Sequence, residues 1–302
     1  MKQLSFLSSE QLSNWLIEVS QQKSTGDLPD YIPLLQETDP NLLGICIITK
    51  NNNILNQGYC QGKFPLMSII KPFLLLYLLS ELGEKFIFKK VGSKPSRYPF
   101  NSIEQLQLDE GFPRNPMINS GALTLASLIP GKDSEKKCYN LLQWLNKQSQ
   151  CNLFVDQSML DSVRSLPNIR NKAILEELNQ RNHIQNPDIT LDTYNRICCI
   201  SGSIIDLAKL GLLLVNSPNI NPKNVILVNN IMTTCGLYEA SEKFAQKIVF
   251  PTKSGVSGGI LSIVPAQGAI ACYSPPLDAQ GNSIAGLSLI EKIANYLKQS
   301  NT

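Results

Sequence analysis

The stretch KSGVSGGILSIVPAQGAIACYS, residues 253–274, contains two apolar runs with a turn between them. GGILSIVP (258–265) and AIACYS (269–274) have the composition of strands, so a β-hairpin is predicted here. A second hairpin is predicted near the start of the chain, where the β-branched run LGICIITK (43–50) is followed by three asparagines and then by ILNQGY. Asparagine tolerates the positive φ that tight turns require.

Helical patterns fill the chain between these two hairpins, from about Ile69 to Val215, as in NKAILEELNQ (171–180). An amphipathic helix capped by Ser8 is expected before the first hairpin, and a closing helix is expected from about Ile284 to Lys298. Strands at both ends imply one sheet that is assembled from distant segments and covered by the terminal helices. The middle of the chain would then form a mostly helical part, with a ligand site between the two.

The composition excludes several classes of protein. Of the 302 residues, 43% are hydrophobic and 17% are charged, so disorder over most of the length is excluded. A net charge of +3 is too small to indicate nucleic acid as a partner. His183 is the single histidine, and it lies in a polar stretch that predicts a solvated loop residue. A catalytic base other than histidine is therefore expected.

The cysteines and the apolar runs indicate the cellular compartment in which the protein is expected. The eight cysteines include no CxxC pair and no zinc-ligand spacing, so buried reduced thiols are predicted. The start of the chain lacks the pattern of a signal peptide. The longest apolar run, Ile69 to Leu79, is interrupted by Lys71 and is too short to cross a bilayer, which takes about 20 residues. We expect a cytoplasmic protein without a membrane partner.

A nucleophile can be activated without histidine when a lysine lies one helical turn away. Ser68 and Lys71 have this Ser-x-x-Lys spacing, and residues i and i+3 of a helix share a face. The apolar residues that follow would bury the lysine, which lowers its pKa and increases its neutral fraction. On spacing alone, a helix-start serine beside a solvated lysine is the more common arrangement.

A second element favours acyl transfer. Lys253-Ser254-Gly255 precedes a predicted strand, and serine acyl-transfer enzymes of the penicillin-recognising type combine Ser-x-x-Lys with such a sequence on a sheet edge. Glycines let backbone N–H groups approach a reacting carbonyl, and Lys253 would add positive potential for an anionic substrate. The alternative for Lys253 to Gly259 is a glycine-rich loop that enters a strand.

These residues belong to longer segments that resemble the serine-dependent glutaminases, which share the β-lactamase-like fold. The resemblance covers about Tyr31 to Gly286. It is carried by YIPLL (31–35), FNSIEQLQLDEGFPRNPMINSGAL (100–123), YNRICC (194–199), DLAKLG (206–211), CGLY (235–238) and residues 253–286. The fold class that it implies is α/β (α+β), as a single catalytic domain over 1–302. A sheet lobe would comprise about 1–65 and 235–302, and a helical lobe about 66–234.

The resemblance also implies a reaction, the hydrolysis of L-glutamine to L-glutamate and ammonia without cofactor or metal. Ser68 would be the nucleophile, Lys71 the base and Tyr238 a proton carrier, and the N–H groups of Ser68 and Val256 would form an oxyanion hole. A homo-oligomer, either a dimer or a tetramer, is implied as well. The substrate contacts that it implies are Tyr31, Ser68, Asn119, Asn171, Tyr194, Tyr238 and Val256, with Arg164 at one further substrate position.

Arg164 departs from the family pattern, because the family usually has at this position a glutamate that holds the substrate's α-amino group. A cation cannot replace a carboxylate in binding an ammonium group. Either another acid such as Asp161 takes this role, or the alignment shifts locally, or substrate affinity and preference differ. Met67, directly before the nucleophile, stands where the family commonly has glutamine.

Alternatives remain open for the function and for single residues. The chain could be a β-lactamase or peptidase of the same fold, or an amino-acid-binding homologue without turnover. Asn119 could cap a helix and Asn171 could simply start one. The tyrosines Tyr31, Tyr194 and Tyr238 could be core residues with satisfied hydroxyl groups.

Overall fold

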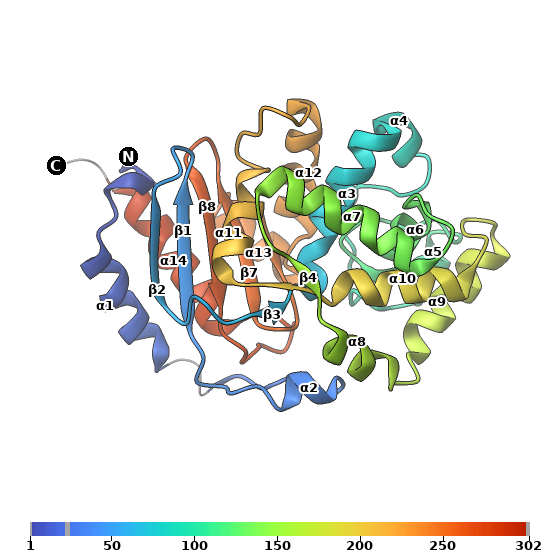
Figure 1. Cartoon of the computed structure of the whole chain (residues 1–302), viewed down its shortest axis with the longest axis horizontal. Helices are drawn as coiled ribbons and strands as arrows, with labels where there is room; N and C mark the ends of the chain where they lie inside the picture. Colours follow the sequence, from blue (N-terminus) through green and yellow to red (C-terminus); the bar gives the residue numbers. More distant parts are fainter. Residues whose placement is uncertain (1, 22–24, 300–302) are drawn as a thin grey trace.

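The computed structural model describes residues 2–21 and 25–299, and its sheet joins the two ends of this chain (Figure 1). In the described part, five antiparallel strands have the order β2-β1-β8-β7-β6. Both predicted hairpins are confirmed, and the first strand pairs with the last, with Gly44 opposite Tyr273. The strands are β1 (Gly44–Thr49), β2 (Ile54–Gly58), β6 (Thr252–Ser254), β7 (Gly259–Val264) and β8 (Gly268–Tyr273).

The helices agree with the predicted patterns where those patterns are long. Ser8 caps the first helix by accepting a hydrogen bond from the N–H of Gln11, and the last helix begins at Ile284 and ends at Lys298 as expected. The helices are α1 (Ser9–Ser20), α2 (Pro33–Gln36), α3 (Ile70–Leu82), α4 (Glu84–Ile87), α5 (Glu104–Leu108), α6 (Asn119–Leu128), α7 (Ser134–Ser149), α8 (Gln157–Arg164), α9 (Ile169–Gln180), α10 (Pro187–Cys198), α11 (Ile204–Leu212), α12 (Pro222–Cys235), α13 (Ser241–Lys247) and α14 (Ile284–Lys298), with short 3₁₀ turns η1 (Leu4–Phe6), η3 (Met67–Ile69) and η4 (Tyr238–Ala240). No helix in this described part is long and apolar enough to span a membrane.

Helices cover both faces of the five-stranded sheet, as Figure 1 shows. Side chains alternate along β1, so that Ile45 and Ile47 pack with α1 and α14, whereas Cys46 and Ile48 face the opposite core. On that second face α11 packs against β1, β7 and β8. Because α11 also contacts α7, it connects the sheet with the helical part of the molecule.

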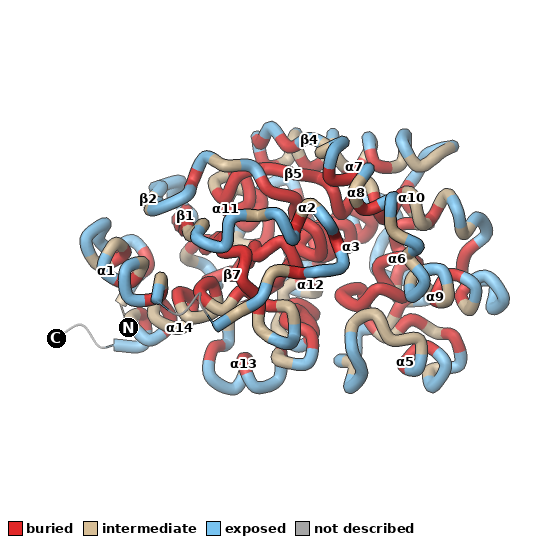
Figure 2. Tube along the Cα trace, turned by 90° about the horizontal axis from the view of Figure 1, so that it is seen from below, coloured by how far each residue is buried: buried red, intermediate tan, exposed pale blue. Residues whose placement is uncertain are grey.

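The centre of the helical part is α3, which is buried from Ile70 to Leu79 and appears as part of the buried interior in Figure 2. A helix that is apolar on all sides must be surrounded by others, and α6, α7 and α12 pack around it. Its first turn, which carries Lys71, is therefore fixed from several directions, and Ser68 lies in η3 directly before it.

A second, small sheet was not predicted. In the described residues it has the order β3-β5-β4, formed by β3 (Phe64–Pro65), β5 (Ile200–Gly202) and β4 (Phe154–Val155). Strands of two or three residues show no periodicity, so the sequence offered no signal for them. The pairing of β3 with β5 holds the chain just before Ser68 beside the end of α10.

We expect Gly211→Val to lower the free energy of unfolding by about 1–3 kcal/mol, because it overpacks the contact between α11 and the sheet. A Cβ atom at Gly211 would lie 2.6 Å from the Cβ of Ala269 and 2.8 Å from a methyl group of Leu261. Urea denaturation measures the change. The control Lys209→Ala, on the same helix, should stay within about 0.5 kcal/mol of the wild type. Equal stability of Gly211→Val and wild type would contradict the close approach of α11.

Candidate active site

Lys71 occupies the first turn of α3, one turn beyond Ser68 in η3. Ser68 is 7% exposed and Lys71 is 0% exposed. The Lys71 Nζ donates hydrogen bonds to the carbonyl oxygen of Met117 at 3.1 Å and to Oδ1 of Asn119 at 2.8 Å. Both acceptors are neutral. Burial lowers the pKa of Lys71 from 10.5 to about 8, so a substantial neutral fraction exists near physiological pH.

Lys253 is a second fully buried lysine, on the edge strand β6. Its Nζ donates to the carbonyl oxygen of Ser254 at 2.7 Å and lies 4.1 Å from the ring centroid of Tyr238. Burial, followed by the charge of Lys71, holds the pKa of Lys253 well below its usual range. The expected position on a sheet edge is confirmed, and burial there opposes the positive charge that was expected of Lys253.

Tyr238 lies in η4 with its hydroxyl within hydrogen-bonding reach of Ser68, and the same hydroxyl is 3.5 Å from the carbonyl oxygen of Ser254. Burial raises the pKa of Tyr238, so its side chain is a neutral phenol that can give and accept a proton. The ring of Phe100 packs against it with centroids 4.5 Å apart. Ser68, Lys253 and Tyr238 thus meet at the junction of the sheet and α3.

Two bulky residues at this junction have left-handed backbone conformations. Met67, directly before Ser68, has φ 48°, and Tyr238 has φ 56°. Side chains other than Gly, Asn and Asp rarely adopt such angles, which cost about 1–3 kcal/mol and cluster at functional sites.

Asn119 links the polar groups around Lys71. Its Oδ1 accepts hydrogen bonds from Lys71 and, at 3.1 Å, from the hydroxyl of Tyr194. Its Nδ2 donates to Oδ1 of Asn171 at 2.9 Å. The alternative that Asn119 caps a helix is wrong, because the N-cap of α6 is Ile118 and the Asn119 side chain is engaged by Lys71.

In the described part of the chain, the two backbone N–H groups expected to form an oxyanion hole donate no hydrogen bond. Among the residues that the structure describes, neither the N–H of Ser68 nor that of Val256 has a hydrogen-bond acceptor. Gly255 permits the close approach of this segment to the start of α3, since a Cβ atom there would lie 2.7 Å from the carbonyl oxygen of Leu66. Buried amides without partners are rare, and these two are free to bind an oxygen atom.

Tyr31 lies on the outer side of this group, between the N-terminal segment and α2. Tyr31 as a whole residue is 50% exposed. Its hydroxyl group is nevertheless shielded from water, because burial is the main cause that raises its pKa to about 12. The hydroxyl is therefore the shielded end of the side chain. The charge that Tyr31 would carry if ionised also raises the pKa values of Tyr194 and Tyr238.

In the described residues, no hydrogen bond or ion pair joins Arg164 to the other predicted site residues. It lies at the end of α8, and its guanidinium group donates to Oδ1 of Asp192 on α10 at 2.6 Å and 2.9 Å. Asp192 also accepts from Arg196 at 2.9 Å. Asp161, the acid considered as a replacement, is 4.0 Å from Arg164 in an exposed ion pair.

Comparison with known proteins identifies the family. The family model described as Glutaminase matches residues 26–301. A glutaminase of Synechocystis sp. is 44% identical over 297 residues, which cover 97% of this chain and 91% of that protein. A glutaminase of Oceanobacillus iheyensis is 37% identical over 305 residues, covering 94% and 92%.

The chain belongs to the glutaminase family. Solved structures agree: the crystal structure of a probable glutaminase from Bacillus subtilis superposes with a TM-score of 0.89, at 28% identity and with 97% of both chains covered. A covalent complex of a Bacillus subtilis glutaminase with 5-oxo-L-norleucine, formed by reaction with 6-diazo-5-oxo-L-norleucine, gives a TM-score of 0.87 at 27% identity, covering 97% and 99%. The expected family, fold class and assignment as an enzyme are confirmed.

In this member of the glutaminase family, sequence reasoning missed Cys198 as a neighbour of the site. Its thiol is within hydrogen-bonding reach of Tyr194, and the charge of Lys71 acts on it. Burial nevertheless raises the pKa of Cys198 to about 11, so it is a neutral thiol. All eight cysteines are free and buried, as predicted. His183 is a loop residue that packs edge-on against Phe112 and is half-buried rather than fully solvated.

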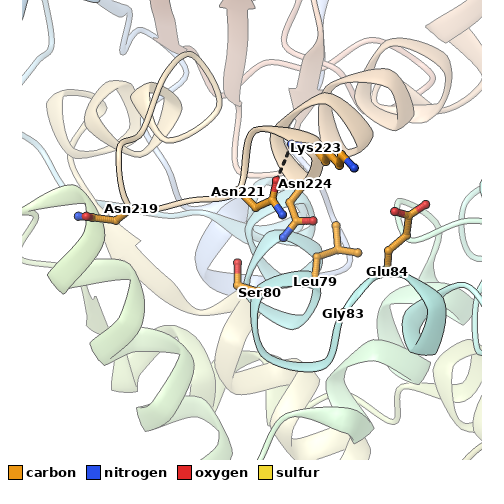
Figure 3. Close-up of a pocket in the computed structure, with 8 residues that line it drawn as sticks. All are labelled: Leu79, Ser80, Gly83, Glu84, Asn219, Asn221, Lys223 and Asn224. Atoms are coloured by element: carbon orange, nitrogen blue, oxygen red, sulfur yellow. Dashed lines mark hydrogen bonds between the residues drawn. The ribbon is translucent and has the colours of Figure 1, made fainter.

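No group of three or more His, Cys, Asp or Glu side chains in the described residues is arranged to hold a metal ion. A surface pocket of about 330 Å³ lies at the opposite end of α3, where its last turn faces the start of α12 (Figure 3). None of the predicted site residues lines it. Its lining residues are Leu79, Ser80, Gly83, Glu84, Asn219, Asn221, Lys223 and Asn224.

The burial of Lys71 predicts a pH-dependent cost in stability. Its pKa is about 8 in the folded chain and 10.5 when unperturbed, so between these values the unfolded state binds more protons and stability rises with pH. Relative to Lys71→Met, the wild type should gain about 2–3 kcal/mol between pH 7 and pH 10. Urea denaturation at both pH values measures this gain.

The control for this experiment is Lys172→Met, at an exposed position on α9. Its difference from the wild type should not depend on pH. If the stability difference between wild type and Lys71→Met were also constant from pH 7 to pH 10, the lowered pKa of Lys71 would be refuted.

Proposed function

We propose that the chain hydrolyses L-glutamine to L-glutamate and ammonia through a γ-glutamyl ester on Ser68, with Lys71 as the base. The observation that carries this proposal is the fully buried Lys71, whose pKa is lowered to about 8 one helical turn from Ser68. A neutral amine next to a hydroxyl activates a serine without histidine. Membership of the glutaminase family supplies the substrate, L-glutamine.

In the first step Ser68 Oγ attacks the side-chain amide carbon and its proton passes to Lys71. The negative charge that develops on the amide oxygen is met by the free N–H groups of Ser68 and Val256. The C–N bond then breaks as the nitrogen takes up a proton and leaves as ammonia. The neutral phenol of Tyr238, within reach of Ser68, is positioned to deliver that proton, and the proton that Lys71 took from Ser68 then restores the phenol.

In the second step a water molecule attacks the ester and gives its proton to Lys71, and the C–O bond to Ser68 breaks. Glutamate leaves and Ser68 regains a proton, so the site returns to its initial state. Asn119 keeps the Lys71 amine oriented in both steps, because it accepts from Nζ at 2.8 Å and is itself held by Asn171 and Tyr194. Tyr31, Asn171 and Tyr194 are proposed as substrate contacts.

Several further parts of the proposal rest on the resemblance to the family. One of these parts is assembly as a dimer or tetramer. Another is a single catalytic domain, in which one lobe comprises about 1–65 and 235–302 and the other comprises about 66–234. A cytoplasmic location is also proposed, supported by eight free cysteines, which are typical of a reducing compartment. Arg164 is also proposed as a substrate-site residue. Only its position in the sequence supports this role, because its guanidinium group is hydrogen-bonded to Asp192.

Ser68→Ala and Lys71→Ala should each lower kcat for ammonia release from glutamine by roughly 10⁴-fold or more, because nucleophile and base act as a unit. Incubation with 6-diazo-5-oxo-L-norleucine, which forms a covalent complex with the Bacillus subtilis relative, should label the wild type on the peptide that contains Ser68. Mass spectrometry detects the label. Full activity of either variant would refute the mechanism, and labelling by penicillin instead would favour the β-lactamase alternative.

The pH profile should report Lys71 as a base. Because the amine must be neutral in the free enzyme, kcat/KM for glutamine should be level above about pH 8 and should fall about tenfold per pH unit well below it. Initial rates of ammonia release, measured from pH 5.5 to pH 10, give this profile. A profile that continued to rise to pH 10 would show that Lys71 has an ordinary pKa, contrary to the proposal.

A further inference from the structure

The pocket of about 330 Å³ at the far end of α3 lies apart from the catalytic residues (Figure 3). Ser80, which lines it, is separated from Lys71 by about 14 Å along the helix axis, at about 1.5 Å per residue. The volume lies at the lower end of the range for small-molecule sites, roughly 300–1,000 Å³. Among the described residues that line the pocket, Leu79 alone has an apolar side chain. These features favour a small, polar ligand.

Asn224 presents a side-chain amide without a partner to this pocket. The residue is 7% exposed, and Figure 3 shows its side chain extending from α12 toward the last turn of α3. Within the described ranges 2–21 and 25–299, this amide has no hydrogen-bond partner. Buried polar side chains are normally hydrogen-bonded. The amide of Asn224 is therefore available to a ligand, to which it can donate and from which it can accept.

The pocket lies between the C-terminus of α3 and the N-terminus of α12, two helices that pack against each other. The helix dipole makes the first end negative and the second end positive. In the described part of the chain, the carbonyl oxygens of Ser80 to Leu82 accept no hydrogen bond. At the start of α12, Asn221 accepts from the backbone N–H groups of Lys223 to Val225, so a ligand there must be bound by side chains.

One acid and one base line the pocket at these two ends. Glu84 follows the end of α3, Lys223 lies in the first turn of α12, and both are exposed. Neither side chain forms a hydrogen bond or an ion pair with any other residue that the structure describes. A purely anionic ligand would be repelled by Glu84, and a purely cationic ligand would be repelled by Lys223. A ligand that carries both charges fits both ends.

We propose that this pocket binds a free zwitterionic α-amino acid with a small polar side chain. Its α-ammonium group lies at the α3 end, where Glu84 and the negative end of the helix dipole stabilise it. Its α-carboxylate lies at the α12 end, where Lys223 and Nδ2 of Asn224 donate hydrogen bonds. The inference concerns a second site and does not depend on the proposed hydrolysis of glutamine.

Isothermal titration calorimetry with L-serine as the probe tests this site. L-Serine carries both charges and a hydroxyl group, whereas ethanolamine lacks its carboxylate and 3-hydroxypropanoate lacks its ammonium group. We expect L-serine to bind with a Kd of about 1 mM or less and each analogue to bind at least about tenfold more weakly, since each leaves one charged group without its partner. An analogue that bound as tightly as L-serine, or no binding of L-serine up to about 10 mM, would overturn the inference.

Substitutions in the pocket should weaken the binding of L-serine. Asn224→Leu should raise Kd about tenfold, because it removes the buried amide. Lys223→Gln and Glu84→Gln should each raise it about threefold to tenfold, because exposed charges are screened by water and salt. These two variants lie at exposed positions, so they test the site even if Asn224→Leu impairs folding. An unchanged Kd in both would refute the assignment of the two charges.

Matched controls remove the same charges elsewhere. Lys172→Gln and Glu176→Gln, both exposed on α9, should leave the Kd of L-serine unchanged. Lys71→Met alters the proposed active site and should also leave it unchanged. A Kd that rose in Lys71→Met but not in the pocket variants would place L-serine in the active site and overturn the second site.

Discussion

The burial of the Lys71 amine without a carboxylate partner is the constraint on which the site depends. An ammonium group enclosed by apolar side chains loses its hydration, so the neutral form is favoured at a pH where an exposed lysine stays charged. The apolar helix α3 supplies this enclosure, and the two neutral acceptors from Met117 and Asn119 orient the amine without restoring its charge. The same constraint extends to Lys253, whose pKa is lowered by its own burial and then by the charge of Lys71.

The proposed mechanism requires a neutral base next to a hydroxyl, and other parts of the site fit this requirement. Left-handed backbone conformations at Met67 and Tyr238 direct Ser68 and the phenol toward each other, and the packing around α3 and β6 holds this strain in place. The same arrangement leaves two amides without acceptors.

The sequence predicted those features that depend on local periodicity or on short-range spacing. The hairpins, the closing helix from Ile284 and the pair of Ser68 and Lys71 belong to this group. It could not predict β3, β4 and β5, which are too short for a period, or the left-handed φ of Met67. The complete burial of Lys253, which opposes its positive charge, could not be predicted, because a motif does not show how deeply its lysine is buried. Arg164 could not be placed, since its partner Asp192 lies 28 residues further along the chain and is joined to it only by the packing of two helices. Tyr238 was found through family resemblance alone.

The pairing of β1 with β8 also concerns the order of events during synthesis on the ribosome. Gly44 pairs with Tyr273, so the first strand has no inner neighbour until nearly the whole chain has left the exit tunnel. Lys253, Val256 and Tyr238 reach the nucleophile through these same late segments. The groups proposed to act with Ser68 and Lys71 therefore join them only after the segment up to Tyr273 has been made. Such long-range closure makes folding slow compared with that of a helical bundle.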